Sequence, residues 1–284
     1  NITTLQKLIW QDQAHTTDSA ESIRFALRRT LDQVEDGGAN RRWNEDSRAN
    51  EWQDHQFSGW AKPKGQTFID DDLLGFMTAE AAKDEGGKGS ANVRRAVLEV
   101  TRAVSLTPWH GDVTFNAASP NATPSAARGE DVSKNPVPYG TEVHATRYQF
   151  GLALTPNRLR DPSRAAKALQ AMGSLRTVAG NHGRFLYDFG PDAIAIRITE
   201  DPAPRLLYCF DTADGGKTVG AKALVDRIKS GDIEADEMIV GLTDEAGPLA
   251  DQVKTAGVSE VHGVRRAIAL ACQRVNESLG LEGE

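Results

Sequence analysis

The sequence has little cysteine, no long hydrophobic run and none of the short motifs of common nucleotide-binding or hydrolytic enzymes. Its two cysteines, Cys209 and Cys272, lie in apolar surroundings without CxxC or Cys/His spacing. Both are therefore predicted to be reduced core residues, and no zinc site is expected. No apolar stretch approaches the roughly 18 residues of a membrane-spanning helix, and no signal peptide is evident. These absences predict a cytoplasmic protein with no cofactor, metal or membrane partner.

Catalytic signals are equally sparse. A P-loop, a dinucleotide fingerprint and a Ser-His-Asp grouping are all missing, so the hydrolase and nucleotide-binding classes lack support. An enzymatic alternative rests on Asp70-Asp71-Asp72, which could gather Mg²⁺, and on His110 with Asp112, which could transfer protons. An acidic run ahead of an apolar segment is more often the charged first turn of a helix. The sequence therefore favours a protein that is not an enzyme.

The charge is negative overall and unevenly distributed. The formal net charge of −7 and the pI near 5.5 argue against bulk attraction to nucleic acid. Residues 144–187 nevertheless hold seven Lys/Arg against one acid, whereas residues 188–284 hold 18 acids against 10 bases. A basic stretch in an acidic protein can still hold a polyanion.

Hydrophobic periodicity predicts alternating helices and strands separated by two long irregular segments. A helix over 19–34 has apolar residues at helical spacing and a capping pair at Asp18 and Glu21. Residues 36–95 are irregular, and residues 107–142 are rich in proline and predict a long projecting loop. The other predicted elements are strands over 97–106 and 143–154, a helix from 161 to a stop at Gly180, strands over 185–189, 193–198 and 206–210, a helix over 221–229, a strand over 238–242 and a helix over 264–275.

This order predicts an α+β fold of the ferredoxin-like or RNA-recognition type. The pattern βαββαβ is obtained if a strand precedes the first helix. Because the chain opens without Met at Asn1, that strand is expected to be missing. The sheet of such a fold commonly carries single-stranded nucleic acid on one face. The strand over 143–154 is predicted to present Arg147 and Gln149 on its exposed face.

Two segments are candidates for contact with an anion. The helix start contains Ser19, Ser22 and Arg24, with Arg28 one turn further on, and helix N-termini bind phosphate readily; the alternative is an ordinary capped amphipathic helix. The turn from Gly180 to Arg184 places Asn181 and His182 between two glycines that permit close backbone approach. Its donors suit phosphate or a ribose hydroxyl, but a glycine-terminated helix entering a strand would give the same pattern.

Several motifs together resemble a family of CRISPR proteins. The helix motif Ser22-Ile23-Arg24-Phe25-Ala26-Leu27-Arg28 is similar to that of the repeat-associated RNA-binding superfamily. More specific motifs are similar to the Cst2/DevR branch of the Cas7 family, the backbone subunit of type I Cascade complexes, of subtype I-B or a relative. They are residues 69–77, 101–106, 145–151 and 180–189, and the resemblance spans essentially the whole chain.

The resemblance implies an architecture. Its palm, with the RNA-recognition fold, corresponds to residues 1–35 and 96–284. A helical finger is inserted at 36–95, and a projecting thumb hairpin lies within the palm at 107–142. Copies are expected to stack as a helical filament along CRISPR RNA (crRNA), which pairs with target DNA, in company with other Cascade subunits. An apolar thumb residue, Val113 or Phe115, would act as a wedge that splays a guide base.

The resemblance also implies an RNA-binding set. Together with the candidates above, it comprises Ser19, Ser22, Arg24, Arg28, Arg102, His110, Arg147, Gln149, Gly180, Asn181, His182, Gly183 and Arg184. Type I subunits of this kind are scaffolds, so no catalytic residue is expected. Related type III subunits cut RNA through a thumb-loop aspartate, and Asp112 and Asp131 lie in the corresponding region. A metal-dependent ribonuclease of the same superfamily is therefore the alternative.

Overall fold

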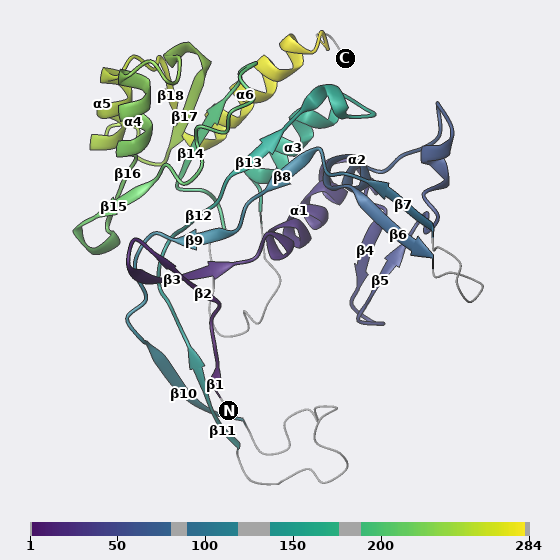
Figure 1. The fold of residues 1–284 in the computed structure, drawn as a ribbon, viewed down its shortest axis with the longest axis horizontal. Helices are drawn as coiled ribbons and strands as arrows, with labels where there is room; N and C mark the ends of the chain where they lie inside the picture. The colour runs from purple at the N-terminus through teal and green to yellow at the C-terminus, as the bar shows by residue number, and fades with distance from the viewer. Residues whose placement is uncertain (1, 81–89, 119–136, 176–188, 282–284) are drawn as a thin grey trace.

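The computed structural model describes residues 2–80, 90–118, 137–175 and 189–281. Its helices and strands form a central body from which two arms extend in different directions (Figure 1). One arm contains the hairpins of residues 41–52 and 76–94, and the other is built around the hairpin of residues 113–142. The α+β class is thus confirmed as a mixture of helices and strands. Across the described ranges, no helix combines the length and apolar character required to cross a bilayer.

Three helices form the centre of the body. They are α1 (Ala20–Val34), α3 (Arg164–Met172) and α6 (Val264–Ser278), with α3 packed against both of the others. In α1, Ile23, Leu27 and Leu31 recur every four residues and are almost fully buried. This single apolar stripe leaves the opposite side of α1 available to polar residues.

The start of α1 differs from the prediction. Ser19 is the N-cap, and its hydroxyl accepts a hydrogen bond from the Ser22 amide at 3.2 Å. Asp18 lies one residue earlier and accepts from the Ser19 amide at 2.9 Å and from the Ser22 hydroxyl at 3.0 Å. The predicted capping pair of Asp18 and Glu21 is therefore wrong by one position, because a serine hydroxyl suits the N-cap as well as a carboxylate does.

The strand that was expected to be missing is present. It is β3 (Gln13–Asp18), which enters α1 directly and forms a hairpin with β2 (Lys7–Trp10). The sheet order is β12-β9-β3-β2, with β9 (Ala103–Ser105) and β12 (Tyr148–Gln149) completing it. The ferredoxin-like order of this sheet stays a prediction, because the strand expected at 185–189 lies outside the described residues.

Two predicted long strands are each divided into two. Residues 97–106 form β8 (Leu98–Val100) and β9, and residues 143–154 form β12 and β13 (Leu152–Leu154). At the break the Thr101 amide donates to the Gly151 carbonyl at 2.9 Å, and the Gly151 amide donates to the Thr101 hydroxyl at 2.8 Å. The side-chain bond replaces a ladder bond, so β13 pairs with β8 in a separate sheet.

The expectation of a helical finger is wrong, because the described part of the insertion after α1 has a framework of two hairpins and one short helix. The elements are β4 (Arg41–Asn44), β5 (Ala49–Trp52), α2 (Ile69–Leu74), β6 (Phe76–Glu80) and β7 (Ser90–Arg94). Phe57 stacks on Phe76 with ring centroids 3.9 Å apart, and Trp60 lies against the same ring at 5.7 Å. This aromatic group gives the insertion a small core of its own.

The second arm contains the hairpin that the family resemblance implies, whereas the proline-rich composition by itself predicted a loop. Strands β10 (Val113–Ala118) and β11 (Val137–Glu142) form an antiparallel hairpin, and β1 (Ile2–Thr3) pairs in parallel with β11. Figure 1 shows this arm extending away from the helices. At its base Glu142 accepts hydrogen bonds from the Leu5 amide at 2.7 Å and from Lys7. The N-terminal segment therefore anchors the arm to the sheet.

The C-terminal part has a second hydrophobic core that the sequence interpretation did not separate. Its elements are β14 (Ala193–Arg197), β15 (Asp211–Ala213), β16 (Thr218–Gly220), α4 (Lys222–Lys229), β17 (Met238–Leu242), α5 (Pro248–Thr255) and β18 (Glu260–His262). Strand β17 is buried at every position between β14 and β18. The buried thiol of Cys209 belongs to this core and that of Cys272 to the first.

Some predicted boundaries are wrong. The helix from residue 161 was expected to reach Gly180, but α3 ends at Met172 with Gly173 as its C-cap. The strand predicted over 206–210 does not form; strand structure begins at Asp211. Helix α5 and strand β18 were not predicted from the sequence.

Candidate nucleic-acid interface

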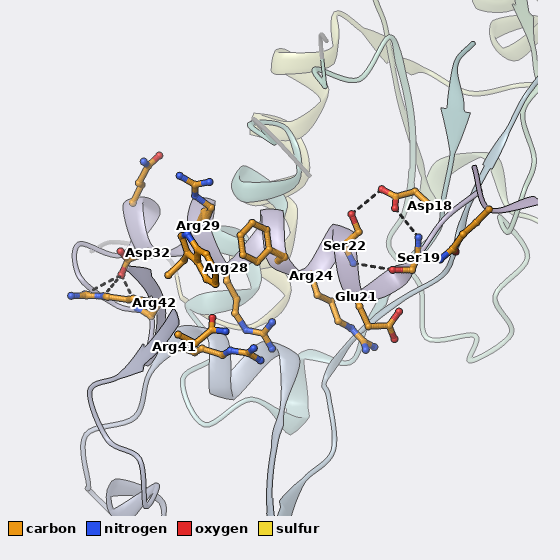
Figure 2. A pocket seen from close by; sticks show the side chains of 16 residues that line it. Asp18, Ser19, Glu21, Ser22, Arg24, Arg28, Arg29, Asp32, Arg41 and Arg42 are labelled. Carbon is orange, nitrogen blue, oxygen red and sulfur yellow. Dashed lines mark hydrogen bonds and ion pairs between the residues drawn. The ribbon is translucent and has the colours of Figure 1, made fainter. Parts of the chain in front are cut away.

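A groove of about 920 Å³ runs between α1 and the β4–β5 hairpin. Figure 2 shows basic side chains reaching into it from both sides. We call it the arginine groove. Its charged lining comprises five arginines against three acids: Arg24, Arg28, Arg29, Arg41 and Arg42 against Asp18, Glu21 and Asp32. An excess of positive charge in a concave surface favours a polyanionic ligand.

Arg24 and Arg28 come from consecutive turns of α1, and Arg41 faces them from β4 (Figure 2). Burial lowers the pKa of the Arg28 guanidinium; Asp70, 3.8 Å away, opposes this shift, and the positive charges of Arg41 and Arg24 add to it. The buried Nε of Arg24 has no hydrogen-bond partner within the described ranges. Three cations are thus held together with incomplete compensation, which an anion would relieve.

The other two arginines are more fully paired. Arg42 donates to the Asp32 carboxylate at 3.0 and 3.2 Å, while Arg29 lies 3.9 Å from Glu45 in an exposed pair. Exposed ion pairs of this kind contribute little stability. Both arginines therefore add positive potential to the groove mouth, with Arg42 partly neutralised by its partner.

The contribution of β4 was missed in the sequence. The run Arg41-Arg42-Trp43 combines two cations with an aromatic residue, a composition typical of single-strand binding surfaces. It lies in the irregular segment after α1, which was assigned only to an insertion. A search for basic and aromatic residues in close succession would have found it.

At the N-terminal end of the groove the predicted serine donors are already engaged. The Ser19 and Ser22 hydroxyls take part in the cap described above, and Ser22 is buried. Hydrogen bonds with its own amide and the Ser19 side chain, and the charges of Arg24 and Arg102, lower the pKa of Glu21 against the effect of burial. The structure thus assigns these serines to holding the helix start.

Arg102 lies beside the groove. Its Nη1 donates to Gln6 at 2.8 Å and to the Thr17 hydroxyl at 3.2 Å, and Gln6 lines the groove. The side chain is exposed. Of the predicted RNA-binding residues that the structure describes, Ser19, Ser22, Arg24, Arg28 and Arg102 are therefore brought together.

Arg147, Gln149 and His110 do not line the arginine groove. Arg147 donates to Asp192 at 2.6 Å and to the Gly216 carbonyl at 2.9 Å in a separate hollow of about 370 Å³. Gln149 was expected on an exposed face, but it is half-buried because its side-chain amide exchanges two hydrogen bonds with the Phe210 backbone, at 2.9 and 3.1 Å. His110 is exposed near the base of the β10–β11 arm.

The remaining predicted RNA contacts cannot be placed in the groove. Gly180, Asn181, His182, Gly183 and Arg184 all lie outside the described residues. The two wedge candidates lie on β10, where Val113 is 52% exposed and Phe115 is 79% exposed. Two residues apart on one strand, their side chains point to the same face. The arm thus presents an apolar pair to its surroundings.

The acidic run is structural. Asp70 accepts from the Asn40 and Arg41 amides at 2.7 and 3.1 Å, and Asp71 accepts from the Asn40 side chain at 2.9 Å. Asp72, fully buried, is bound by the guanidiniums of Arg94 and Arg164 and by the amides of Arg160 and Asp161. The Mg²⁺ interpretation of this run is therefore wrong: its carboxylates are occupied by N–H donors that join the insertion to the body.

The structure offers no further metal candidate in the part of the chain it describes, where no three His, Cys, Asp or Glu side chains converge. Asp112 is exposed beside the hairpin base, and Asp131 is outside the described ranges. His144 lies close by and is held by the Thr16 and Thr107 hydroxyls at 2.7 and 3.3 Å. Burial lowers the pKa of His144, so this imidazole is neutral and links the arm to β3.

Comparison with known proteins gives consistent matches. The family model described as "CRISPR-associated negative auto-regulator DevR/Csa2" matches residues 13–177. A protein of Myxococcus xanthus (strain DK1622) named "CRISPR-associated protein Cas7/Cst2/DevR" is 56% identical over 277 residues, covering 97% of this chain and 90% of that protein.

Two solved chains share the fold at low sequence identity. One, from a "CRISPR RNA-guided surveillance complex, pre-nicking", has a TM-score of 0.51 and 13% identity and covers 94% of each chain. The other, from a "CRISPR RNA-guided surveillance complex", has a TM-score of 0.52 and 14% identity, covering 94% of this chain and 91% of that one. At such identities these likenesses concern the fold alone.

Proposed function

The chain belongs to the DevR/Csa2 family of CRISPR-associated proteins, as a Cas7 family member of CRISPR type I, and we propose that it is a non-catalytic backbone subunit of an interference complex. In this role copies of the chain polymerise along crRNA, hold its phosphates and leave its bases free to pair with target DNA. The other subunits of the complex are its further partners. The RNA-recognition type of palm and a cytoplasmic location are parts of the same proposal.

The observation that carries the proposal is the crowding of Arg24, Arg28 and Arg41 in one groove. Folding brings these like charges together at an electrostatic cost, and among the described residues only the Arg28 guanidinium has a carboxylate, that of Asp70, within 4 Å. RNA phosphates would supply the missing negative charge. Phosphate contacts carry no sequence information, which suits a subunit that must accept any guide.

The β10–β11 arm supports the proposed assembly into a filament. The β10–β11 arm extends from the body (Figure 1). Val113 and Phe115 are exposed on its strand β10. An exposed apolar pair on a projecting hairpin can contact a neighbouring copy and insert between guide bases. Separating bases at intervals would leave short segments accessible to the target strand.

The test removes two groove charges, Arg24→Ala with Arg41→Ala. Among the described residues, neither guanidinium forms an ion pair within 4 Å. The double variant should bind single-stranded RNA more weakly. Its plot of log affinity against log salt should be less steep by about 1.4, roughly 0.7 for each phosphate contact. Fluorescence anisotropy over a salt series measures both quantities, and mass photometry with guide RNA measures filament formation.

The matched control is Arg265→Ala with Arg266→Ala, which removes the same charge from exposed positions on α6. The control should keep the salt dependence and filament length of the unaltered chain. Equal affinity, slope and assembly in the groove variant and the control would refute the proposal.

The non-catalytic role is tested by incubating the assembled complex with complementary RNA and Mg²⁺. Cleavage that is abolished by Asp112→Ala or Asp131→Ala would make the chain a ribonuclease.

A further inference from the structure

Trp43 is an exposed aromatic side chain in the wall of the arginine groove. It lies on β4, is 37% exposed and lines the groove together with Arg41 and Asn50. In the β4–β5 ladder Trp43 pairs with Asn50, and Arg41 pairs with Trp52. Because side chains alternate between faces of a strand, these four residues share one face of the hairpin. Three of them line the groove, so this face is directed toward α1.

Within the described residues, the Trp43 indole has one aromatic contact and keeps about a third of its surface exposed. Phe25 of α1 contacts Trp43 in an edge arrangement, with ring centroids 6.4 Å apart and an interplanar angle of 73°. Trp52, its neighbour on the same face, is packed by Phe57 at 5.7 Å and lies beneath the Arg41 guanidinium at 5.5 Å. Trp52 is as exposed as Trp43, at 38%, but it packs in the aromatic core of the insertion and does not line the groove, whereas Trp43 does.

An aromatic ring beside a row of cations has a specific use in single-strand recognition. Arginines hold successive phosphates while a base stacks on the ring, and any base can do so because each has a π-face. A protein partner would require an apolar patch, but the groove is lined mainly by charged and polar side chains. The surroundings of Trp43 therefore favour a nucleobase.

We propose that Trp43 is a stacking platform for one base of the single-stranded RNA whose phosphates contact Arg24 and Arg41. This inference rests on the proposed function of the arginine groove and adds a non-electrostatic contact to it. The β4–β5 hairpin is then a direct part of the RNA-binding surface. Stacking at Trp43 is indifferent to base identity, as phosphate contacts are.

The test measures the affinity for oligouridine of three proteins: Trp43→Ala, Trp43→Phe and the unaltered full chain. Loss of one stacked base should weaken binding roughly 5- to 150-fold, the range for removal of one aromatic platform. The slope of log affinity against log salt should stay unchanged, because no phosphate contact is lost. Trp43→Phe should retain most of the affinity. Photo-crosslinking with 5-iodouridine should yield a covalent product at Trp43.

Met77→Ala is the matched control, since Met77 is an exposed apolar residue on β6 outside the groove. It should bind as the unaltered chain does, and thermal melting checks that each variant is folded. Unchanged affinity in Trp43→Ala, or crosslinks that avoid Trp43 in an RNA-bound chain, would overturn the stacking proposal while leaving the groove function intact. Failure of the unaltered chain to bind RNA would overturn both.

Discussion

At the residue scale, the run Asp70-Asp71-Asp72 contains one carboxylate, that of Asp71, which burial keeps partly protonated near neutral pH. Burial, and secondarily the charge of Asp70, raise the pKa of Asp71 from 3.8 to about 7, although a hydrogen bond from Asn40 acts in the opposite direction. The pKa of Asp70 is also raised by burial. The three neighbouring aspartates therefore differ in role, since Asp72 is compensated by two arginines.

The raised pKa of Asp71 makes stability depend on pH. The folded state binds this proton more tightly than the unfolded state, so the stabilisation is complete below about pH 4 and is lost as pH rises through about 7. Asp71→Asn cannot ionise and keeps an acceptor for Asn40. The unaltered chain loses this stabilisation between pH 5 and pH 8, and the variant does not. The free energy of unfolding of Asp71→Asn minus that of the unaltered chain should therefore rise over this interval by on the order of 2–4 kcal/mol.

Denaturant unfolding of both proteins at the two pH values measures this difference. The control is Asp72→Asn, which removes charge from the Arg94 and Arg164 pairs and should destabilise the chain at both pH values. A constant difference between Asp71→Asn and the unaltered chain from pH 5 to pH 8 would show that Asp71 is ionised throughout.

At the element scale, the turn between α2 and β6 fixes the insertion to the body. Gly75 is the C-cap of α2 and has φ of +71°, and a Cβ at this position would lie 2.3 Å from the Arg94 carbonyl oxygen and 2.7 Å from the Ala96 amide. Both obstacles are backbone atoms of the strand that returns from the insertion. Only glycine allows the two segments to approach this closely.

Gly75→Ala should therefore destabilise the chain by more than its backbone conformation alone requires. A non-glycine residue in a disfavoured backbone conformation costs about 1–3 kcal/mol, and the clash with β7 and the residues after it adds to this. Gly231→Ala separates the two effects, because Gly231 has φ of +78° with open space around it. Thermal melting of both variants gives the comparison. Equal losses of stability would mean that the close approach at Gly75 relaxes at no cost.

At the scale of the whole molecule, charge is segregated. Residues 188–284 carry 18 acids and 10 bases, and the region contains the second hydrophobic core. The arginine groove lies between α1 and the insertion instead. Under the proposed function, repulsion from the acidic region would confine RNA to the groove in spite of the net charge of −7.

Crosslinking of guide RNA in the assembled complex should accordingly yield peptides from 19–52 and none from beyond residue 215. Mass spectrometry of the crosslinked peptides gives the positions. In the matched variant, Asp232→Lys with Glu234→Lys reverses two exposed charges in the acidic region and should bring crosslinks into it. Abundant crosslinks beyond residue 215 in the unaltered chain would contradict the charge-segregation model.

The sequence by itself determined the mixed class, helix α1, strand β17, the reduced core cysteines and the family. Periodicity and specific motifs are local properties of the chain, so they can be read without a structure. It also identified Arg24 and Arg28 as neighbours on one helix face. The prediction from the sequence placed the N-cap of α1 one residue early and did not include α5 and β18.

Only the tertiary structure decided which distant residues share a surface. It brought Arg41 and Trp43 opposite α1, paired Arg147 with Asp192, and enclosed Gln149 against the Phe210 backbone. It also showed that the acidic run satisfies buried N–H groups. Each outcome depends on contacts between separate elements of the fold. There the packing and the hydrogen-bond partners, and not local propensity, set the free energy of the folded arrangement.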